Sequence, residues 1–231
     1  VIVVPDYKAI MPLMSEISAF VKEFNISAGY PIKRSSLFGL IFEIFEAQRR
    51  KKKHGYYAKD YLSVISHPLS KNLRLADDEI ITRILVHKTE EILTGRIESD
   101  FGGSLFIDLN DIENIDLLFL LSIETLKNMG IEIEIDRLKK CLARLNELLF
   151  INWETINTFK MFLKSLKELL KELVDKSFLF SYKFNLTIAK ELFEFIEEME
   201  NLHFSDERFE KDEIFRIFEE IVSSLSIKFK G

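Results

Sequence analysis

The chain has 231 residues, of which 47% are hydrophobic, enough to bury a core in one large domain or two small ones. Its net charge is −6, which argues against strong autonomous DNA binding but leaves room for a local contact. The single Cys141 excludes an internal disulfide framework and fits a reducing, cytoplasmic compartment. No apolar run approaches the ~18–20 residues of a membrane span, so no membrane contact is expected.

The start of the chain has the pattern of an α/β layer. Residues 1–4, VIVV, form a β-branched run that ends at Pro5 and predicts a buried strand. A second strand is predicted at residues 25–27, closed by a turn at 29–31, and a helix opens at residues 35–36. An amphipathic helix between the two strands is predicted from the spacing of Ile10, Met14, Ile17 and Val21. This order belongs to an α/β layer rather than to a helical bundle. Because the chain starts inside a strand and lacks an initiator Met, we expect an internal fragment.

Two basic features flank the helix that opens at residues 35–36. Lys33 and Arg34 follow the predicted turn, and five consecutive cations follow the helix where its apolar pattern stops. The five form the basic run: Arg49, Arg50, Lys51, Lys52 and Lys53. We interpret the run as an exposed linker. It could neutralise DNA phosphates or contact another subunit, or it could be a solvated helix end, where cations are favourable.

From residue 56 on, the pattern is nearly all helical. His67-Pro68 stops the first of these helices, because the residue before a proline is pushed out of the α region. Residues 96–115 are predicted to be a loop with a short strand at 105–107. The predicted helices cover residues 57–66, 77–94, 116–129, 135–149, 156–173, 186–203 and 207–225.

Two neighbouring helices of this set carry heptad seams. The first seam has 3-4-3-4 spacing, at Ile135, Leu138, Leu142, Leu145 and Leu149. The second has 3-4-3-4-3 spacing, at Ile156, Phe159, Leu163, Leu166, Leu170 and Leu173. The short connection around Trp153 predicts an antiparallel hairpin. Such seams are more often internal core than a partner groove, so Leu145 and Leu166 are expected to be buried.

Six landmarks follow one another along the chain: the strand at residues 1–4, NISAGYP at 25–31, SSL at 35–37, YYAKDYL at 56–62, LSVISHP at 62–68 and SIKFKG at 226–231. In this order they resemble the AddB/RecC-like inactivated UvrD-type helicase subunits of bacterial helicase–nucleases, which are PD-(D/E)XK nuclease family proteins. Relatives tend to have Val-Thr-Met or Val-Thr-Leu where this chain has Ile26-Ser27-Ala28, and the first seventy residues carry nearly all the specificity.

The resemblance implies a mostly α fold in which a small α/β piece precedes a multi-helix domain. Residues 1–50 would be part of a second RecA-like helicase domain, and residues 51–231 an inserted accessory helical domain of the 2B type. The family's proteins work with an AddA-like helicase–nuclease subunit to unwind and digest DNA double-strand ends and prepare them for recombination. In relatives, the segment that corresponds to residues 226–231 leads back into the RecA-like layer.

The function expected from the resemblance is a non-catalytic scaffold or DNA-path domain of an AddB-like DNA-repair helicase–exonuclease. DNA contact would then be weak and made through the parent complex. Two alternatives stay open: a protein-interaction helical module with no DNA contact, and an unrelated helical regulatory domain.

Catalytic motifs are missing from the sequence. A phosphate-binding P-loop is absent, and Gly102-Gly103-Ser104 is expected to be a flexible turn. Asp6-Tyr7-Lys8 mimics part of a nuclease motif, but no metal ligand precedes it, and Asp6 is more simply a helix cap. We therefore expect no catalytic residue and no turnover of ATP or DNA.

Metal and nucleophile chemistry is not indicated either, so no metal and no cofactor is expected. None of the histidines has a partner at zinc-ligand spacing, and Cys141 lies in the first heptad seam, where core packing is the simpler role. An acidic segment at residues 100–113 lacks EF-hand spacing and is expected to be a solvated loop. The four histidines are His54, His67, His87 and His203.

Overall fold

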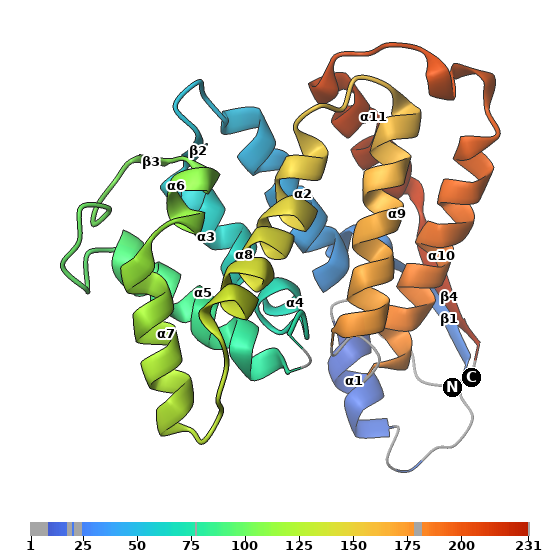
Figure 1. The fold of residues 1–231 in the computed structure, drawn as a ribbon. Helices are drawn as coiled ribbons and strands as arrows, with labels where there is room; N and C mark the ends of the chain where they lie inside the picture. Colours follow the sequence, from blue (N-terminus) through green and yellow to red (C-terminus); the bar gives the residue numbers. More distant parts are fainter. Residues whose placement is uncertain (1–8, 18–19, 21–24, 77, 178–181, 231) are drawn as a thin grey trace.

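The computed structural model describes residues 9–17, 20, 25–76, 78–177 and 182–230, and this part of the chain is mostly helical (Figure 1). The predicted fold class, mostly α, is therefore confirmed. The described strands form two sheets of two strands each. The strand predicted at residues 1–4 lies outside the described residues, as does the proposed cap Asp6. None of the described helices combines the length and the apolar character that crossing a bilayer requires.

The N-terminal helix and strand were predicted in outline. Helix α1 (Ile10–Ile17) precedes strand β1 (Asn25–Pro31), which pairs antiparallel with strand β4 (Ser226–Lys230). The turn predicted at residues 29–31 is wrong, because Tyr30 and Pro31 continue the strand and pair with Ile227 and Ser226. A register irregularity between Ile26 and Tyr30 takes the place of the turn.

The helix predicted at residues 35–36 is confirmed. A short 3-10 turn, η2 (Ile32–Arg34), leads into helix α2 (Ser36–Arg50). The Ser35 hydroxyl caps α2 by accepting a hydrogen bond from the Phe38 backbone N–H (3.1 Å), which satisfies one of the unpaired donors of the first turn. The apolar face of α2 is buried, so this helix is the central element of the core.

The remaining helices agree with the predicted ones within a few residues, whereas α4 and α6 were not predicted. Figure 1 shows α3, α5, α6 and α7 on one side of α2 and α8, and α9, α10 and α11 on the other. The short strand predicted within residues 96–115 is β3, which pairs with β2. These elements are β2 (Tyr56–Tyr57), α3 (Ala58–Ser66), α4 (Pro68–Lys71), α5 (Glu79–Leu93), β3 (Phe106–Ile107), α6 (Leu109–Glu113), α7 (Asp116–Asn128), α8 (Ile135–Leu149), η3 (Ile151–Trp153), α9 (Phe159–Lys176), α10 (Lys183–Glu200), η5 (His203–Asp206) and α11 (Lys211–Ser224).

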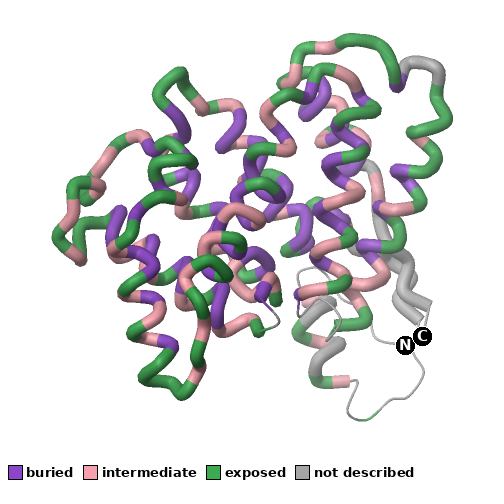
Figure 2. Tube along the Cα trace, in the orientation of Figure 1, coloured by how far each residue is buried: buried purple, intermediate pink, exposed green. Residues whose placement is uncertain are grey.

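The predicted seams of α8 and α9 are core. Leu145 and Leu166 are both 0% exposed, which confirms the prediction, and buried positions follow the inward sides of these helices (Figure 2). On the outside of the pair, Arg144 of α8 forms ion pairs with Glu168 (2.9 Å) and Glu172 (2.7 Å) of α9. The hairpin is therefore held by apolar packing inside and by charge outside.

An aromatic cluster joins α2 to the C-terminal helices. The Phe45 ring of α2 stacks on Phe215 of α11, with ring centroids 4.0 Å apart, and meets Trp153 and Phe162 edge-on or tilted. One hydrophobic cluster includes these rings together with residues of α3, α5 and α8. The domain boundary expected between residues 50 and 51 stays a prediction, and this cluster extends across it.

Candidate nucleic-acid interface

The two basic features lie at opposite ends of α2. Lys33 and Arg34 belong to η2, directly before the helix, and both are exposed. The basic run begins in the last turn of the helix, at Arg49 and Arg50. A helix of 15 residues is about 22 Å long, so the structure does not bring the two features together into one patch.

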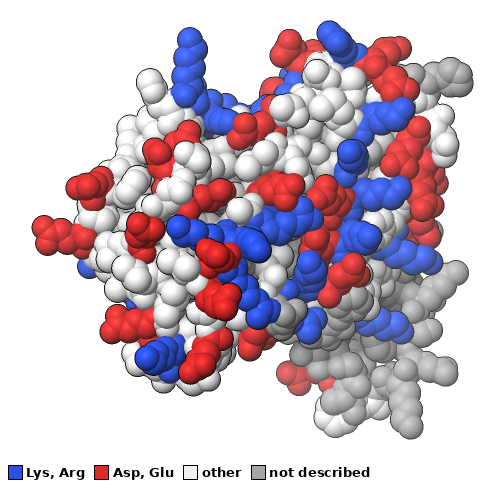
Figure 3. All heavy atoms as spheres, viewed as in Figure 1, with Lys and Arg blue, Asp and Glu red and all other residues white. Residues whose placement is uncertain are grey.

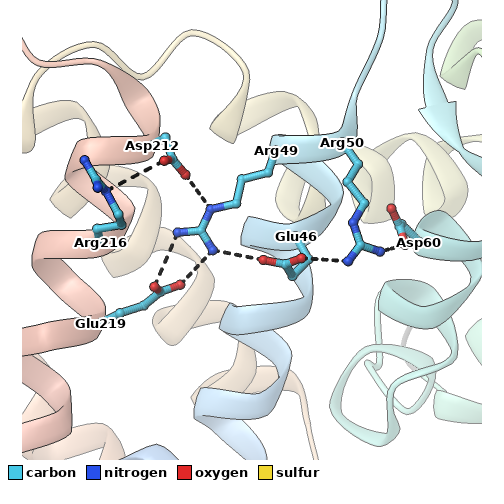
Figure 4. A network of polar contacts seen from close by, with 7 residues as sticks. All are labelled: Glu46, Arg49, Arg50, Asp60, Asp212, Arg216 and Glu219. Carbon is cyan, nitrogen blue, oxygen red and sulfur yellow. Dashed lines mark hydrogen bonds and ion pairs between the residues drawn. The ribbon is translucent and has the colours of Figure 1, made fainter.

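Arg49 is part of the folded body and not of a linker. Its guanidinium forms ion pairs with Asp212 (2.5 Å) and Glu219 (3.0 Å) of α11, and with Glu46 (2.9 Å) one turn back in α2 (Figure 4). Burial would lower the pKa of Arg49, but the hydrogen bonds to Glu219, Asp212 and Glu46 outweigh burial and raise it. Arg49 thus links α2 to α11, and its side chain is committed to its carboxylate partners.

The next two cations are also paired. Arg50 contacts Glu46 (2.9 Å) and Asp60 of α3 (3.1 Å), as Figure 4 shows. Lys51 lies 2.6 Å from the Glu154 carboxylate. The interpretation of the run as an exposed linker is therefore wrong for its first three residues, because partners distant in sequence hold them.

A buried polar network lies beneath Lys51. The Gln48 amide donates a hydrogen bond to the Tyr56 hydroxyl (2.8 Å), which donates one to Glu154 (2.9 Å). Lys211 of α11 donates a hydrogen bond to the side-chain amide oxygen of Gln48 (3.0 Å). Burial, followed by the charge of Glu154, raises the pKa of Tyr56, so the hydroxyl stays protonated as a donor. This network ties α2, β2 and α11 together and was not predicted from the sequence.

Lys52 and Lys53 remain from the run as exposed cations. They lie in a tight turn in which the Lys52 N–H donates to the Gly55 carbonyl (2.9 Å) and the Gly55 N–H donates to the Lys52 carbonyl (3.1 Å). His54 is exposed in the same turn. The part of the basic run that is available to an external anion is therefore a short, backbone-braced turn.

The remaining candidate functional residues have structural roles. Cys141 is buried and its Sγ lies 3.6 Å from the Thr82 hydroxyl, which agrees with a core role. His67 caps α4, and burial lowers its pKa to about 4, with a smaller effect of Lys71. Within the described residues, no group of three or more His, Cys, Asp or Glu side chains is arranged to hold a metal ion.

Charges of both signs are interspersed over the face shown in Figure 3, with Lys and Arg side chains gathered over α9. That gathering was not predicted from the sequence, although Lys160, Lys164, Lys167 and Lys171 recur there at helical spacing. Comparisons of this chain with protein-family models, with curated proteins and with solved structures return no match.

Proposed function

We propose that this chain is a non-catalytic helical scaffold domain of an AddB-like subunit in a DNA-repair helicase–nuclease, where it works with an AddA-like subunit. The observation that carries the proposal is the pairing of β1 with β4 at the two ends of the helical body. The strands are neighbours through Asn25↔Lys230 and Pro31↔Ser226, and the Ile32 N–H adds a bond to the Leu225 carbonyl (3.2 Å). A helical body that leaves one strand and returns to its neighbour is the arrangement of an inserted domain.

A two-stranded ribbon is marginal by itself, because stable sheets need more strands or a packed face. Membership in a larger α/β layer would complete it, which is the place that the resemblance gives to these strands. The described helices would then project from that layer as an accessory domain, and the large aromatic core would keep that domain rigid.

Binding to an AddA-like subunit tests this proposal directly. The purified chain and the AddA-like subunit of the same organism are expected to co-elute in size-exclusion chromatography at micromolar concentrations. An unrelated nuclease subunit serves as the control and is expected to elute separately. Separate elution of the AddA-like subunit as well would contradict the assignment to a helicase–nuclease.

DNA contact is proposed to be weak, local and salt-sensitive, and to use Lys52 and Lys53. We expect a Lys52→Glu/Lys53→Glu variant to bind a forked duplex more weakly in fluorescence anisotropy. Each lost phosphate contact lowers the slope of log affinity against log salt by ~0.9, so the slope should fall by about 2. Melting temperature should not change, because both side chains are exposed.

Two further variants sharpen this experiment. Lys127→Glu/Lys140→Glu has the same change in net charge on exposed positions of α7 and α8, and it is expected to bind DNA as the wild type does. Arg50→Glu/Lys51→Glu is expected to lower the melting temperature, because it places carboxylates against Asp60 and Glu154. Equal DNA binding by the Lys52→Glu/Lys53→Glu variant and the wild type would remove the turn from the DNA path.

A protein-interaction module without DNA contact is the second candidate function. The internal ion pairs of Arg49, Arg50 and Lys51 favour it, since three of the five cations in the run already have carboxylate partners. An unchanged salt slope in the Lys52→Glu/Lys53→Glu variant, together with co-elution with the AddA-like subunit, would select this function.

A further inference from the structure

Helix α9 carries a straight row of lysines on its outer surface. The spacing of 4, 3 and 4 residues places the row within an arc of about 60° around the helix. Within the described part of the chain, Lys164 and Lys171 form no hydrogen bond or ion pair, and both are exposed. Lys160 and Lys167 form exposed ion pairs, with Asp206 (3.0 Å) and Glu200 (3.1 Å). The basic row consists of Lys160, Lys164, Lys167 and Lys171.

Helix α10, the neighbour of α9, carries the opposite charge on its outer surface. Glu194, Glu197 and Glu198 are exposed and form the acidic row. Glu194 lies 3.5 Å from Lys190 one turn back, whereas the carboxylates of Glu197 and Glu198 have no ion pair among the described residues. A row of cations and a row of anions therefore lie on adjacent helices of one face.

An apolar groove lies between α9 and α10, beside the acidic row. It has a volume of about 300 Å³ and is lined by Val174 of α9 and by Leu186, Ala189 and Phe193 of α10, with Lys190, Glu194 and Glu197 at its edge. Val174, Leu186 and Phe193 are only half-buried. An apolar centre between charged margins is the composition of a protein–protein contact rather than of a nucleic-acid contact.

Only the C-terminal end of the basic row, at Lys171, is level with the acidic row. The ion pair Lys167–Glu200 joins α9 to the end of α10, and the pair of Lys160 with Asp206 of η5, the element that follows α10, shows that the two helices run antiparallel. One residue forward in α9 therefore corresponds to one residue back in α10. By this register Lys171 is level with residue 196, close to all three members of the acidic row. The carboxylates of the acidic row would repel the phosphates of a nucleic acid laid along the basic row.

We propose that α9 and α10 form a self-association surface that binds a second copy of this chain. A two-fold axis along the seam between the helices places Lys171 of each copy over the acidic row of the other, and Lys167 over Glu200. A two-fold axis across the seam would instead place each row over its own counterpart, which repulsion excludes. The charges thus select one symmetric arrangement, an isologous dimer in which both groove linings meet at the axis.

The size of this face sets the strength of the dimer. Two helices of 18 residues are each about 27 Å long and lie about 10 Å apart, so the face covers about 500 Å² per copy. The total of about 1,000 Å² is near the lower limit for a specific interface. The dimer is therefore weak, and because its margins are charged, it dissociates as salt rises.

The proposal is tested by reversing the charges of each row separately and then mixing the two variants. Dimerisation is measured by sedimentation equilibrium at micromolar to sub-millimolar protein concentrations. The basic-row variant is Lys164→Glu/Lys171→Glu, and the acidic-row variant is Glu197→Lys/Glu198→Lys. The wild type is expected to dimerise at low salt and to become monomeric at high salt. Each variant alone should dimerise at least about tenfold more weakly, because like charges then oppose each other across the axis. An equimolar mixture of the two variants should recover a dimer, since the reversed rows are complementary.

Controls separate this surface from net charge and from misfolding. Lys127→Glu/Lys140→Glu and Glu124→Lys/Glu132→Lys change the net charge equally at exposed positions elsewhere and should dimerise as the wild type does. Thermal melts of all variants should match, because none of the four substituted side chains in the rows forms an ion pair with another described residue.

Three results would each overturn the proposal. The first is a wild type that stays monomeric at low salt. The second is a pair of variants that dimerise with wild-type affinity, and the third is a mixture that stays monomeric. If the wild type stays monomeric while the basic-row variant alone loses affinity for a duplex oligonucleotide, the basic row binds a polyanion instead of a second copy.

Discussion

Truncation of either mid-seam leucine, Leu145→Ala in α8 or Leu166→Ala in α9, is expected to lower the free energy of unfolding by about 2–5 kcal/mol. Both side chains are 0% exposed, so each substitution removes buried apolar atoms and leaves a cavity that the packed helices fill only in part. Urea denaturation followed by circular dichroism measures the loss as a lower midpoint with an unchanged slope.

An exposed leucine provides the matched control. Leu120 lies on α7 and is 60% exposed, so Leu120→Ala should change the unfolding free energy by less than about 0.5 kcal/mol. Wild-type stability in Leu145→Ala and Leu166→Ala would mean that the seams face a partner rather than the core.

The helical part of this fold was predictable because its signals are local. The heptad seams of α8 and α9 predict both helices and the buried face of each from the residues of each segment alone. Asp78 caps α5 by accepting a hydrogen bond from the Ile80 N–H (2.8 Å), and such a cap can be read from neighbouring residues alone. Short elements such as α4 and α6 lack that information, since four or five residues show no period.

The contacts of the basic run could not be predicted from the neighbouring residues in the sequence. From its neighbours it looks like a solvated linker, because five cations in sequence repel each other and have no apolar period. The carboxylates that hold Arg49 on α11 are Asp212 and Glu219, more than 160 residues away in sequence. Only the folding of α11 against α2 brings them together, and no pattern within the run indicates that contact.

The pairing of β1 with β4 was missed for the same reason. Ser226–Lys230 was expected to lead back toward the α/β layer, but nothing in its five residues specifies Asn25–Pro31 as its partner or an antiparallel direction. The interpretation of residues 29–31 as a turn followed from Gly29 and Pro31, both of which favour turns. In the structure the pairing with β4 overrides that preference, and Gly29 lies within the irregularity between Ile26 and Tyr30.

The turn that carries Lys52 and Lys53 depends on Gly55, and Gly55→Ala is expected to be among the most destabilising single changes outside the core. Gly55 has φ +113°, a conformation that disfavours a side chain by about 1–2 kcal/mol. An added Cβ would also overlap the carbonyl group of Ile107 in β3, a backbone group that cannot rotate away. Overpacking of this kind costs about 1–3 kcal/mol, so we expect a total loss of about 2–5 kcal/mol in urea denaturation.

Gly103→Ala separates the steric part of this effect from the conformational part. Gly103 also has a positive φ, +75°, but an added Cβ would meet no atom within 4 Å. Its substitution should therefore cost only the conformational component, about 1–2 kcal/mol. The additional loss of unfolding free energy in Gly55→Ala measures how strongly the contact with β3 fixes the turn that carries Lys52 and Lys53. Equal losses in the two variants would show that β3 moves aside, and that the position of Lys52 and Lys53 is not fixed by this contact.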